Sequence, residues 1–147
     1  MEKVLVTGAS GFIAEHCIIE LLKNGYSVKG SLRTMSREQE VRDAVKTETD
    51  DAKLEFCRLD LLDDDGWEEA MRDCDYLMHV ASPFVIEDPK DENELIKPAK
   101  EGTLRALNAA KKAGIKRVVL TSSVAAVNSH MMSGTSDHTT WTDINSK

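Results

Sequence analysis

The fold of this chain is decided by one stretch near its start, VLVTGASGFIA at residues 4–14. Its first three residues predict a short buried strand, and the segment from Gly11 to Asn24 has helical spacing and ends at Gly25. Two glycines between a strand and a helix let the backbone approach a pyrophosphate, and the helix N-terminus stabilises its negative charge. The spacing is Gly-x-x-Gly-x-x-Ala with no Gly-Lys-Ser/Thr after it, so the turn is not a P-loop. We therefore predict a dinucleotide-binding turn at Gly8 and Gly11.

The rest of the chain repeats the alternation of short apolar runs and helical segments. This pattern predicts a doubly wound parallel sheet in the order 3-2-1-4-5, with the ligand outside the carboxyl ends of its strands. Because the runs are rich in Val, Leu and Ile, we expect strands covered on both faces. The predicted strands are Val4 to Thr7, Val28 to Arg33, Leu54 to Leu59, Tyr76 to Ala81 and Val118 to Thr121. The later predicted helices are Arg37 to Thr47, Trp67 to Met71 and Glu92 to Ala113, the last with an apolar stripe of Leu95, Ala99, Thr103, Ala106, Leu107 and Ala110 and capped by Gly114.

Composition and charge limit the function classes. The 147 residues include 26 acidic and 19 basic side chains, a formal charge of −7, which argues against a basic nucleic-acid-binding face. No apolar run approaches the roughly 18 residues of a membrane span, and no secretory signal opens the chain. We therefore expect a cytoplasmic protein of one domain, without membrane or nucleic-acid partners. The three cysteines and four histidines have spacings that predict neither a disulfide framework nor a metal site, and we interpret the cysteines as small buried apolar residues.

The end of the second predicted strand indicates which dinucleotide is bound. An enzyme that uses NAD typically places an acidic residue there, against the ribose 2′-hydroxyl. Here the sequence reads Leu32-Arg33-Thr34-Met35-Ser36-Arg37, with no acid before Glu38. A guanidinium can bind a 2′-phosphate through two parallel hydrogen bonds, whereas a carboxylate repels it. The sequence therefore favours NADP(H) over NAD, with Arg33 as the first candidate ligand.

Motifs at four strand ends, taken together, resemble one family. They are TGASGFIA at 7–14, Asp60-Leu61 after the third strand, VASPF at 80–84 after the fourth and TSSVAAV at 121–127 after the fifth. In this order they are similar to the extended short-chain dehydrogenase/reductases, and within them to the dihydroflavonol-reductase branch with its yeast-type aldehyde, ketone and methylglyoxal reductases. The resemblance covers essentially all 147 residues. It implies a Rossmann cofactor-binding domain over residues 1–147 and hydride transfer to a small carbonyl substrate.

The resemblance also implies a role for each matching residue. Gly8, Ser10, Gly11, Phe12 and Ile13 would surround the pyrophosphate, and Arg33 with Arg37 would hold the 2′-phosphate. Asp60 and Leu61 would flank the adenine, and Ala81 and Ser82 would lie along the nicotinamide-side ribose. Ser123 matches the family's catalytic serine, which hydrogen-bonds the substrate oxygen and is not a nucleophile. His79, inside an apolar run, is interpreted as packed and hydrogen-bonded and not as catalytic.

The family's proton donor has no match in these residues. Family members use a Tyr, with a Lys four residues later that lowers the Tyr pKa. This chain has only Tyr26 and Tyr76, which are followed four residues later by Gly30 and Val80. The polar, Trp-containing segment from Asp137 to Asp143 resembles the stretch that precedes the Tyr in the family. The sequence thus predicts a chain that stops short of the later strands and the substrate region, as a fragment or as a truncated paralogue.

Three functions remain open from the sequence. The first is an NADP(H)-dependent reductase of a small aldehyde or ketone, represented by its cofactor-binding part and inactive alone. The second is a non-catalytic dinucleotide-binding or redox-sensing module, and the third is a nucleotide-sugar epimerase or dehydratase. Arg33 disfavours the third, because such enzymes more often keep NAD tightly bound. A homodimer remains open as well.

Overall fold

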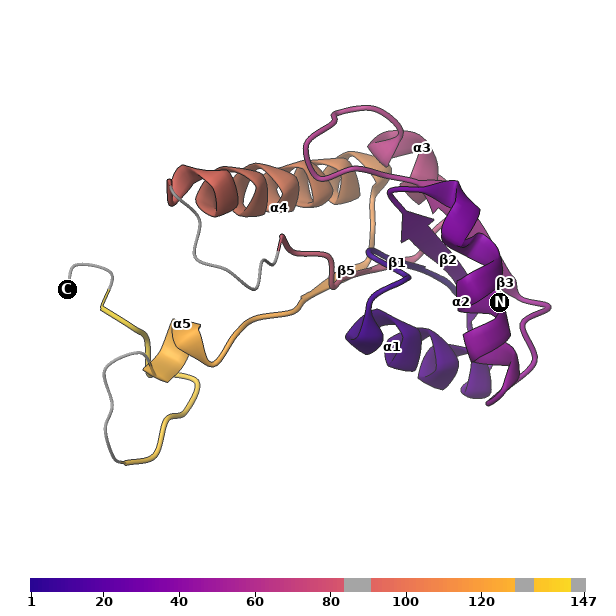
Figure 1. Cartoon of the computed structure of the whole chain (residues 1–147), viewed down its shortest axis with the longest axis horizontal. Helices are drawn as coiled ribbons and strands as arrows, with labels where there is room; N and C mark the ends of the chain where they lie inside the picture. Colours follow the sequence, from indigo (N-terminus) through magenta and orange to yellow (C-terminus); the bar gives the residue numbers. More distant parts are fainter. Residues whose placement is uncertain (84–90, 129–133, 144–147) are drawn as a thin grey trace.

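The computed structural model describes residues 1–83, 91–128 and 134–143 of the chain. At its centre is a parallel sheet of five strands in the order β3-β2-β1-β4-β5 (Figure 1). The order expected from the sequence is therefore confirmed. The strands are β1 (Lys3–Val6), β2 (Ser27–Leu32), β3 (Leu54–Arg58), β4 (Tyr76–His79) and β5 (Arg117–Leu120).

The strands begin and end within two residues of the predicted positions. Thr7 and Arg33, the predicted last residues of two strands, lie outside the sheet pairing and begin the following loops. The central strand β1 pairs with β2 and with β4, and its Leu5 and Val6 have no exposed surface. Burying each such side chain contributes about 1.5–3 kcal/mol to folding, which explains why short apolar runs were reliable signals.

The expectation that all strands are covered on both faces is wrong for β5. Val119 and Leu120 are each 48% exposed. The reason is that, of the apolar residues of β5, only Val118 packs against a hydrophobic cluster of the described residues.

Two helices pack on one face of the sheet. Helix α1 (Phe12–Lys23) ends before Gly25, whose φ of +86° reverses the chain into β2. Helix α2 (Glu38–Lys46) follows a short 3-10 turn, η1 (Met35–Arg37), so the helix predicted from Arg37 starts one residue later. Residues of both helices form one hydrophobic cluster with the inner face of β1, β2 and β3.

The other face is covered by α3 (Trp67–Met71) and α4 (Asn93–Ala113), which lie on the opposite side of the sheet from α1 (Figure 1). Helix α4 ends at Gly114, which has a φ of +72° as expected for its cap. The predicted apolar stripe of α4 needs correction, because Leu107 is exposed. Small residues bring α4 close to α3 and to the loop after β3, and the buried face consists of Gly102, Ala106, Ala109 and Ala110.

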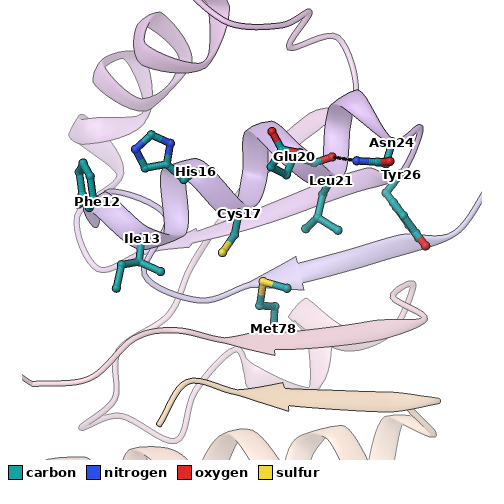
Figure 2. A pocket seen from close by; sticks show the side chains of 9 residues that line it. All are labelled: Phe12, Ile13, His16, Cys17, Glu20, Leu21, Asn24, Tyr26 and Met78. Atoms are coloured by element: carbon teal, nitrogen blue, oxygen red, sulfur yellow. Dashed lines mark hydrogen bonds between the residues drawn. The ribbon is translucent and has the colours of Figure 1, made fainter. Parts of the chain in front are cut away.

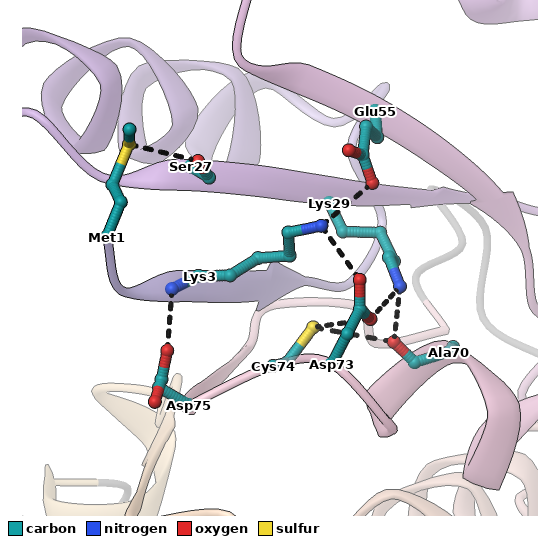
Figure 3. Close-up of polar contacts among 9 residues, drawn as sticks. All are labelled: Met1, Lys3, Ser27, Lys29, Glu55, Ala70, Asp73, Cys74 and Asp75. Atoms are coloured by element: carbon teal, nitrogen blue, oxygen red, sulfur yellow. Dashed lines mark hydrogen bonds and ion pairs between the residues drawn. The ribbon is translucent and has the colours of Figure 1, made fainter.

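A network of charged side chains joins the end of α3 to the sheet (Figure 3). Lys3 of β1 contacts Asp73 at 2.8 Å and Glu55 of β3 at 3.0 Å. Lys29 of β2 pairs with the same Asp73 and donates to the Ala70 carbonyl at 3.1 Å. The two ammonium groups lower the pKa of Asp73 to about 2, mainly through their hydrogen bonds. This network lies at the end of α3, next to the apolar cluster in which Trp67, Ala70 and Met71 pack with Leu5 of the sheet.

The cysteines are free thiols, as the sequence predicts, but all three are half-buried and not fully buried. Burial raises the pKa of the Cys57 and Cys74 thiols to about 11, so that both stay protonated and unreactive at neutral pH. None of the helices in the described residues combines the length and hydropathy that a bilayer crossing requires.

Candidate cofactor site

The glycine turn after β1 is a compact loop fixed by backbone hydrogen bonds. Gly8 adopts a φ of +72°, and its carbonyl accepts the Gly11 N–H at 2.9 Å. Gly11 is the N-cap of α1 and offers no side chain to cap the first turn of the helix. The N–H groups that open α1 are therefore left for a ligand or for water.

The turn is fixed to the end of β2 by Ser31, a residue that the sequence did not single out. The Ser31 side-chain oxygen accepts the Gly8 N–H at 3.2 Å, and its carbonyl accepts the Ala9 N–H at 2.8 Å. Gly30 makes room for this contact, because a Cβ there would lie 2.8 Å from the Cβ of Ala9. The available signal was a Gly-Ser pair inside a predicted strand.

The turn also lies directly against the end of β4. A Cβ on Gly8 would lie 3.1 Å from the Cβ of Ala81 and 3.2 Å from its Cα. The hydroxyl of Thr7 accepts the N–H groups of Val80 and Ala81, each at 3.0 Å. The predicted site residues Gly8 and Ala81 are thus in contact, and Ser82 follows them as an exposed residue.

His79 is packed and hydrogen-bonded, as the sequence predicts. It is 1% exposed, and its Nδ1 lies 2.9 Å from the Thr7 hydroxyl. Burial lowers the pKa of His79, so the neutral imidazole is favoured. Nothing in this arrangement exposes the ring to a substrate.

Two arginines follow β2, as the sequence predicts, and one of them reaches the glycine turn. Arg37 Nη1 donates to the Ser10 hydroxyl at 2.8 Å, although the two residues are 27 positions apart. Arg37 also binds Glu40 of α2, at 2.6 Å from Nη2 and 2.9 Å from Nε. This hydrogen-bonded pair raises the pKa of Arg37 and lowers that of Glu40. Arg33 is exposed immediately after β2.

Asp60 and Leu61 shape the loop after β3. The Asp60 carboxylate accepts the Leu62 N–H at 3.0 Å, and the Asp60 carbonyl accepts the Trp67 indole N–H at 3.3 Å. Leu61 packs against α4, because a Cβ on Gly102 would lie 2.8 Å from the Leu61 side chain. Both residues therefore have structural partners already, and their adenine contacts stay a prediction.

Phe12 and Ile13 line an open groove of about 580 Å³ between α1 and β4. Figure 2 shows their side chains at the start of α1, with Met78 of β4 facing the helix. Phe12 is 77% exposed and its ring packs edge-on against His16 at 4.7 Å between centroids. These two residues form an apolar flank of the candidate site, whereas Ser10 and Arg37 form a polar one.

Ser123 lies on the segment between β5 and the short helix α5 (Ala125–Asn128). It is exposed, and its hydroxyl oxygen accepts the Ala125 N–H at 3.2 Å. This is the contact of a residue that caps a helical turn. Its proposed contact with a substrate oxygen is a separate role that this geometry does not test.

Comparison with known proteins identifies relatives over nearly the whole chain. The family model described as the NAD dependent epimerase/dehydratase family matches residues 4–142. A bifunctional dihydroflavonol 4-reductase/flavanone 4-reductase of Malus domestica is 34% identical over 145 residues, which are 97% of this chain and 42% of the relative. A cinnamoyl-CoA reductase of Medicago truncatula is 41% identical over 125 residues, 84% of this chain and 38% of the relative.

A solved structure shows the same arrangement of elements. The yeast methylglyoxal/isovaleraldehyde reductase, crystallised in complex with NADPH, superimposes with a TM-score of 0.80 at 32% identity. The match covers 95% of this chain and 43% of that structure, so the chain spans about two fifths of the length of the relatives it matches. From the strand order, the glycine turn and these matches together, the chain belongs to the NAD dependent epimerase/dehydratase family, the extended short-chain dehydrogenase/reductases.

Proposed function

We propose that residues 1–147 are the cofactor-binding Rossmann domain of an NADP(H)-dependent oxidoreductase that reduces a small aldehyde or ketone. The observation that carries this proposal is the contact of the glycine turn with the end of β4. Gly8 has no side chain, and its backbone approaches Ala81 so closely that a Cβ would lie 3.1 Å from the Ala81 Cβ. Such a convergence of two strand ends beside a helix N-terminus fits the pyrophosphate of a dinucleotide.

The residues around this turn fit the remaining parts of the cofactor. Gly8, Ser10, Gly11, Phe12 and Ile13 would surround the pyrophosphate. The polar flank supports a 2′-phosphate, because Arg37 already reaches Ser10 and Arg33 is exposed at the end of β2. Asp60 and Leu61 would flank the adenine, and Ala81 and Ser82 would contact the ribose next to the nicotinamide. The yeast relative is described as binding NADPH, which supports the same choice.

The reaction would be reduction of a carbonyl group, for which the cofactor supplies the hydride when bound. Ser123 would hydrogen-bond the carbonyl oxygen as negative charge develops on it. The described relatives are named as reductases of dihydroflavonols, cinnamoyl-CoA and methylglyoxal, which supports reduction over epimerisation. Because residues 1–147 include no Tyr-x-x-x-Lys pair, we expect these residues by themselves to turn over no methylglyoxal or aromatic aldehyde.

A titration with NADPH and NADH tests the cofactor assignment, since the two differ only in the 2′-phosphate. Arg33→Glu replaces an attraction to that phosphate by a repulsion. We expect it to weaken the binding of NADPH at least about tenfold more than the binding of NADH, which is the effect expected from the loss of one strong charge contact. Arg72→Glu, a charge reversal at an exposed residue after α3, is the matched control. Equal losses of NADPH and NADH in Arg33→Glu would contradict the assignment, and turnover that Ser123→Ala abolishes would contradict the expected inactivity.

A further inference from the structure

Glu40 holds the guanidinium that the polar flank of the site presents. Its carboxylate receives two hydrogen bonds from Arg37, at 2.6 Å from Nη2 and 2.9 Å from Nε. The third contact of this guanidinium is Ser10 of the glycine turn, at 2.8 Å from Nη1. An acidic side chain is thus bound to the very group that a 2′-phosphate would need.

The charges oppose phosphate binding at this position. The Glu40 carboxylate neutralises the positive charge of Arg37 and adds a negative charge within hydrogen-bond distance of it. Both side chains are about half exposed, at 47% and 56%, so the interaction acts partly through solvent and is sensitive to salt. The Glu15 carboxylate on α1 adds a weaker attraction for the same arginine.

The neighbouring acid on α2 has different partners. Glu38 binds Arg42 at 2.9 Å, and Arg42 also contacts Asp51 at 3.1 Å and lies over the Phe56 ring. The charge of Glu38 is therefore directed toward the loop before β3 and away from the glycine turn. Two glutamates in the first turn of one helix thus differ in which arginine they neutralise.

We infer that Glu40 is a specificity-determining residue that weakens the preference of this chain for a 2′-phosphorylated dinucleotide. The inference rests on the proposed function, because it assumes that Arg37 faces the 2′-phosphate. It predicts that removal of this one negative charge improves binding of NADPH and leaves binding of NADH unchanged. Gln in place of Glu keeps the shape and one hydrogen-bond acceptor for Arg37, so the change is chiefly one of charge.

The experiment measures dissociation constants of NADPH and NADH for the wild-type chain, Glu40→Gln and the matched control Glu38→Gln. At low ionic strength we expect Glu40→Gln to lower the dissociation constant of NADPH about threefold to tenfold. This is the effect expected from removing one partly screened charge near the phosphate. NADH should change less than about twofold, and Glu38→Gln should change neither cofactor by more than that. At about 0.5 M salt the gain should fall below about twofold, because salt screens the interaction between exposed charges.

Three results would overturn the inference. NADPH binding that is unchanged in Glu40→Gln excludes the charge effect, and weaker binding shows that Glu40 orients Arg37 for the phosphate. An equal gain in Glu38→Gln shows a general effect of net charge and no role of the Arg37 contact. Failure of the proposed function is distinguishable, because the wild-type chain would then bind neither dinucleotide.

Discussion

The hydroxyl of Thr7 lies 2.9 Å from Nδ1 of His79 and joins the ends of β1 and β4 across 72 positions of sequence. The same oxygen accepts the N–H groups of Val80 and Ala81, so its own proton is directed to the histidine. This requires a neutral His79 with its ring proton on Nε2, an atom that is buried and has no hydrogen-bond partner among the described residues. One side chain thus fixes two strand ends and the tautomer of a buried ring.

Replacement of Thr7 by Val should therefore lower the free energy of unfolding by more than the small change in the side chain suggests. Val keeps the shape but leaves two N–H groups and the Nδ1 of His79 without a partner, for an expected loss of about 2–4 kcal/mol in the free energy of unfolding. Urea denaturation measures this loss. Thr7→Ser retains the hydroxyl and should lose less than half as much, and equal losses in the two variants would contradict a role for the hydroxyl.

Two glycines with the same backbone angle allow the cost of backbone strain to be measured separately from the cost of a steric contact. Gly8 and Gly114 both have a φ of +72°. A Cβ added at Gly8 would meet Ala81 within 4 Å, whereas a Cβ added at Gly114 would meet no described atom within that distance. Ala at Gly114 should cost about 1 kcal/mol from backbone strain. Ala at Gly8 should cost about 1–3 kcal/mol more, because it displaces the end of β4, and should weaken NADPH binding. Similar losses of stability at the two sites in thermal unfolding would show that the Gly8 contact is unimportant.

Gly102 sets the position of the loop that carries Leu61. In the middle of α4 an Ala should gain about 1 kcal/mol from helix propensity. Its Cβ would lie 2.8 Å from the Leu61 side chain, however. We therefore expect a net loss of stability of about 1–2 kcal/mol. Leu61→Gly removes the Cβ, Cγ and Cδ2 atoms that the new Cβ would meet, and in a double-mutant cycle Gly102→Ala should cost less in that background than in the wild type. Additive effects of the two changes would contradict the contact.

Asp73 should make stability depend on pH in the acid range. Its pKa in the folded chain is about 2, below the ordinary 3.8, because Lys29 and Lys3 hydrogen-bond its carboxylate. The stabilisation is therefore complete above pH 3.8 and is lost as the pH falls toward about 2. Since the carboxylate is half exposed, the contribution should stay under about 1 kcal/mol after screening.

Urea denaturation between about pH 5 and about pH 2.5 measures this dependence. At low ionic strength the profile of Asp73→Asn should be flatter than that of the wild type, and added salt should reduce the difference. A profile identical to that of the wild type would exclude the network as its source.

The sheet could be predicted from the sequence because its central strand is a short apolar run whose burial strongly stabilises the fold. Leu5 and Val6 have no exposed surface, and such residues can be placed only inside a sheet or a helix that is covered. The stripe of α4 was less predictable, because close packing favours small residues. Gly102 and Ala109 are buried, whereas the larger Leu107 is at the surface.

The places of Gly8 and Ala81 after β1 and β4 could be predicted from the sequence, and their roles toward a cofactor stay a prediction. The sequence could not identify Ser31, since its hydrogen bond to Gly8 depends on how β2 lies beside β1. Glu40 was missed as well, although it stands three residues from Arg37 on one face of a helical turn. A charge pair at this spacing is usually an exposed pair of little consequence, and only the contact of Arg37 with Ser10 connects it to the site.

The strand order has a consequence for the synthesis of the protein. Strand β1 is the centre of the sheet and is made before its partner β4, which ends only at His79. At about 5–20 residues per second, β1 waits several seconds for that partner. During this time β2 and α1 can pack beside it, but the face that carries Leu5 stays uncovered until α3 (Trp67–Met71) has been made, and α4 follows only after β4. Until then the nascent chain carries one helix-covered layer beside β1 and one exposed apolar face, and such a face is prone to aggregation.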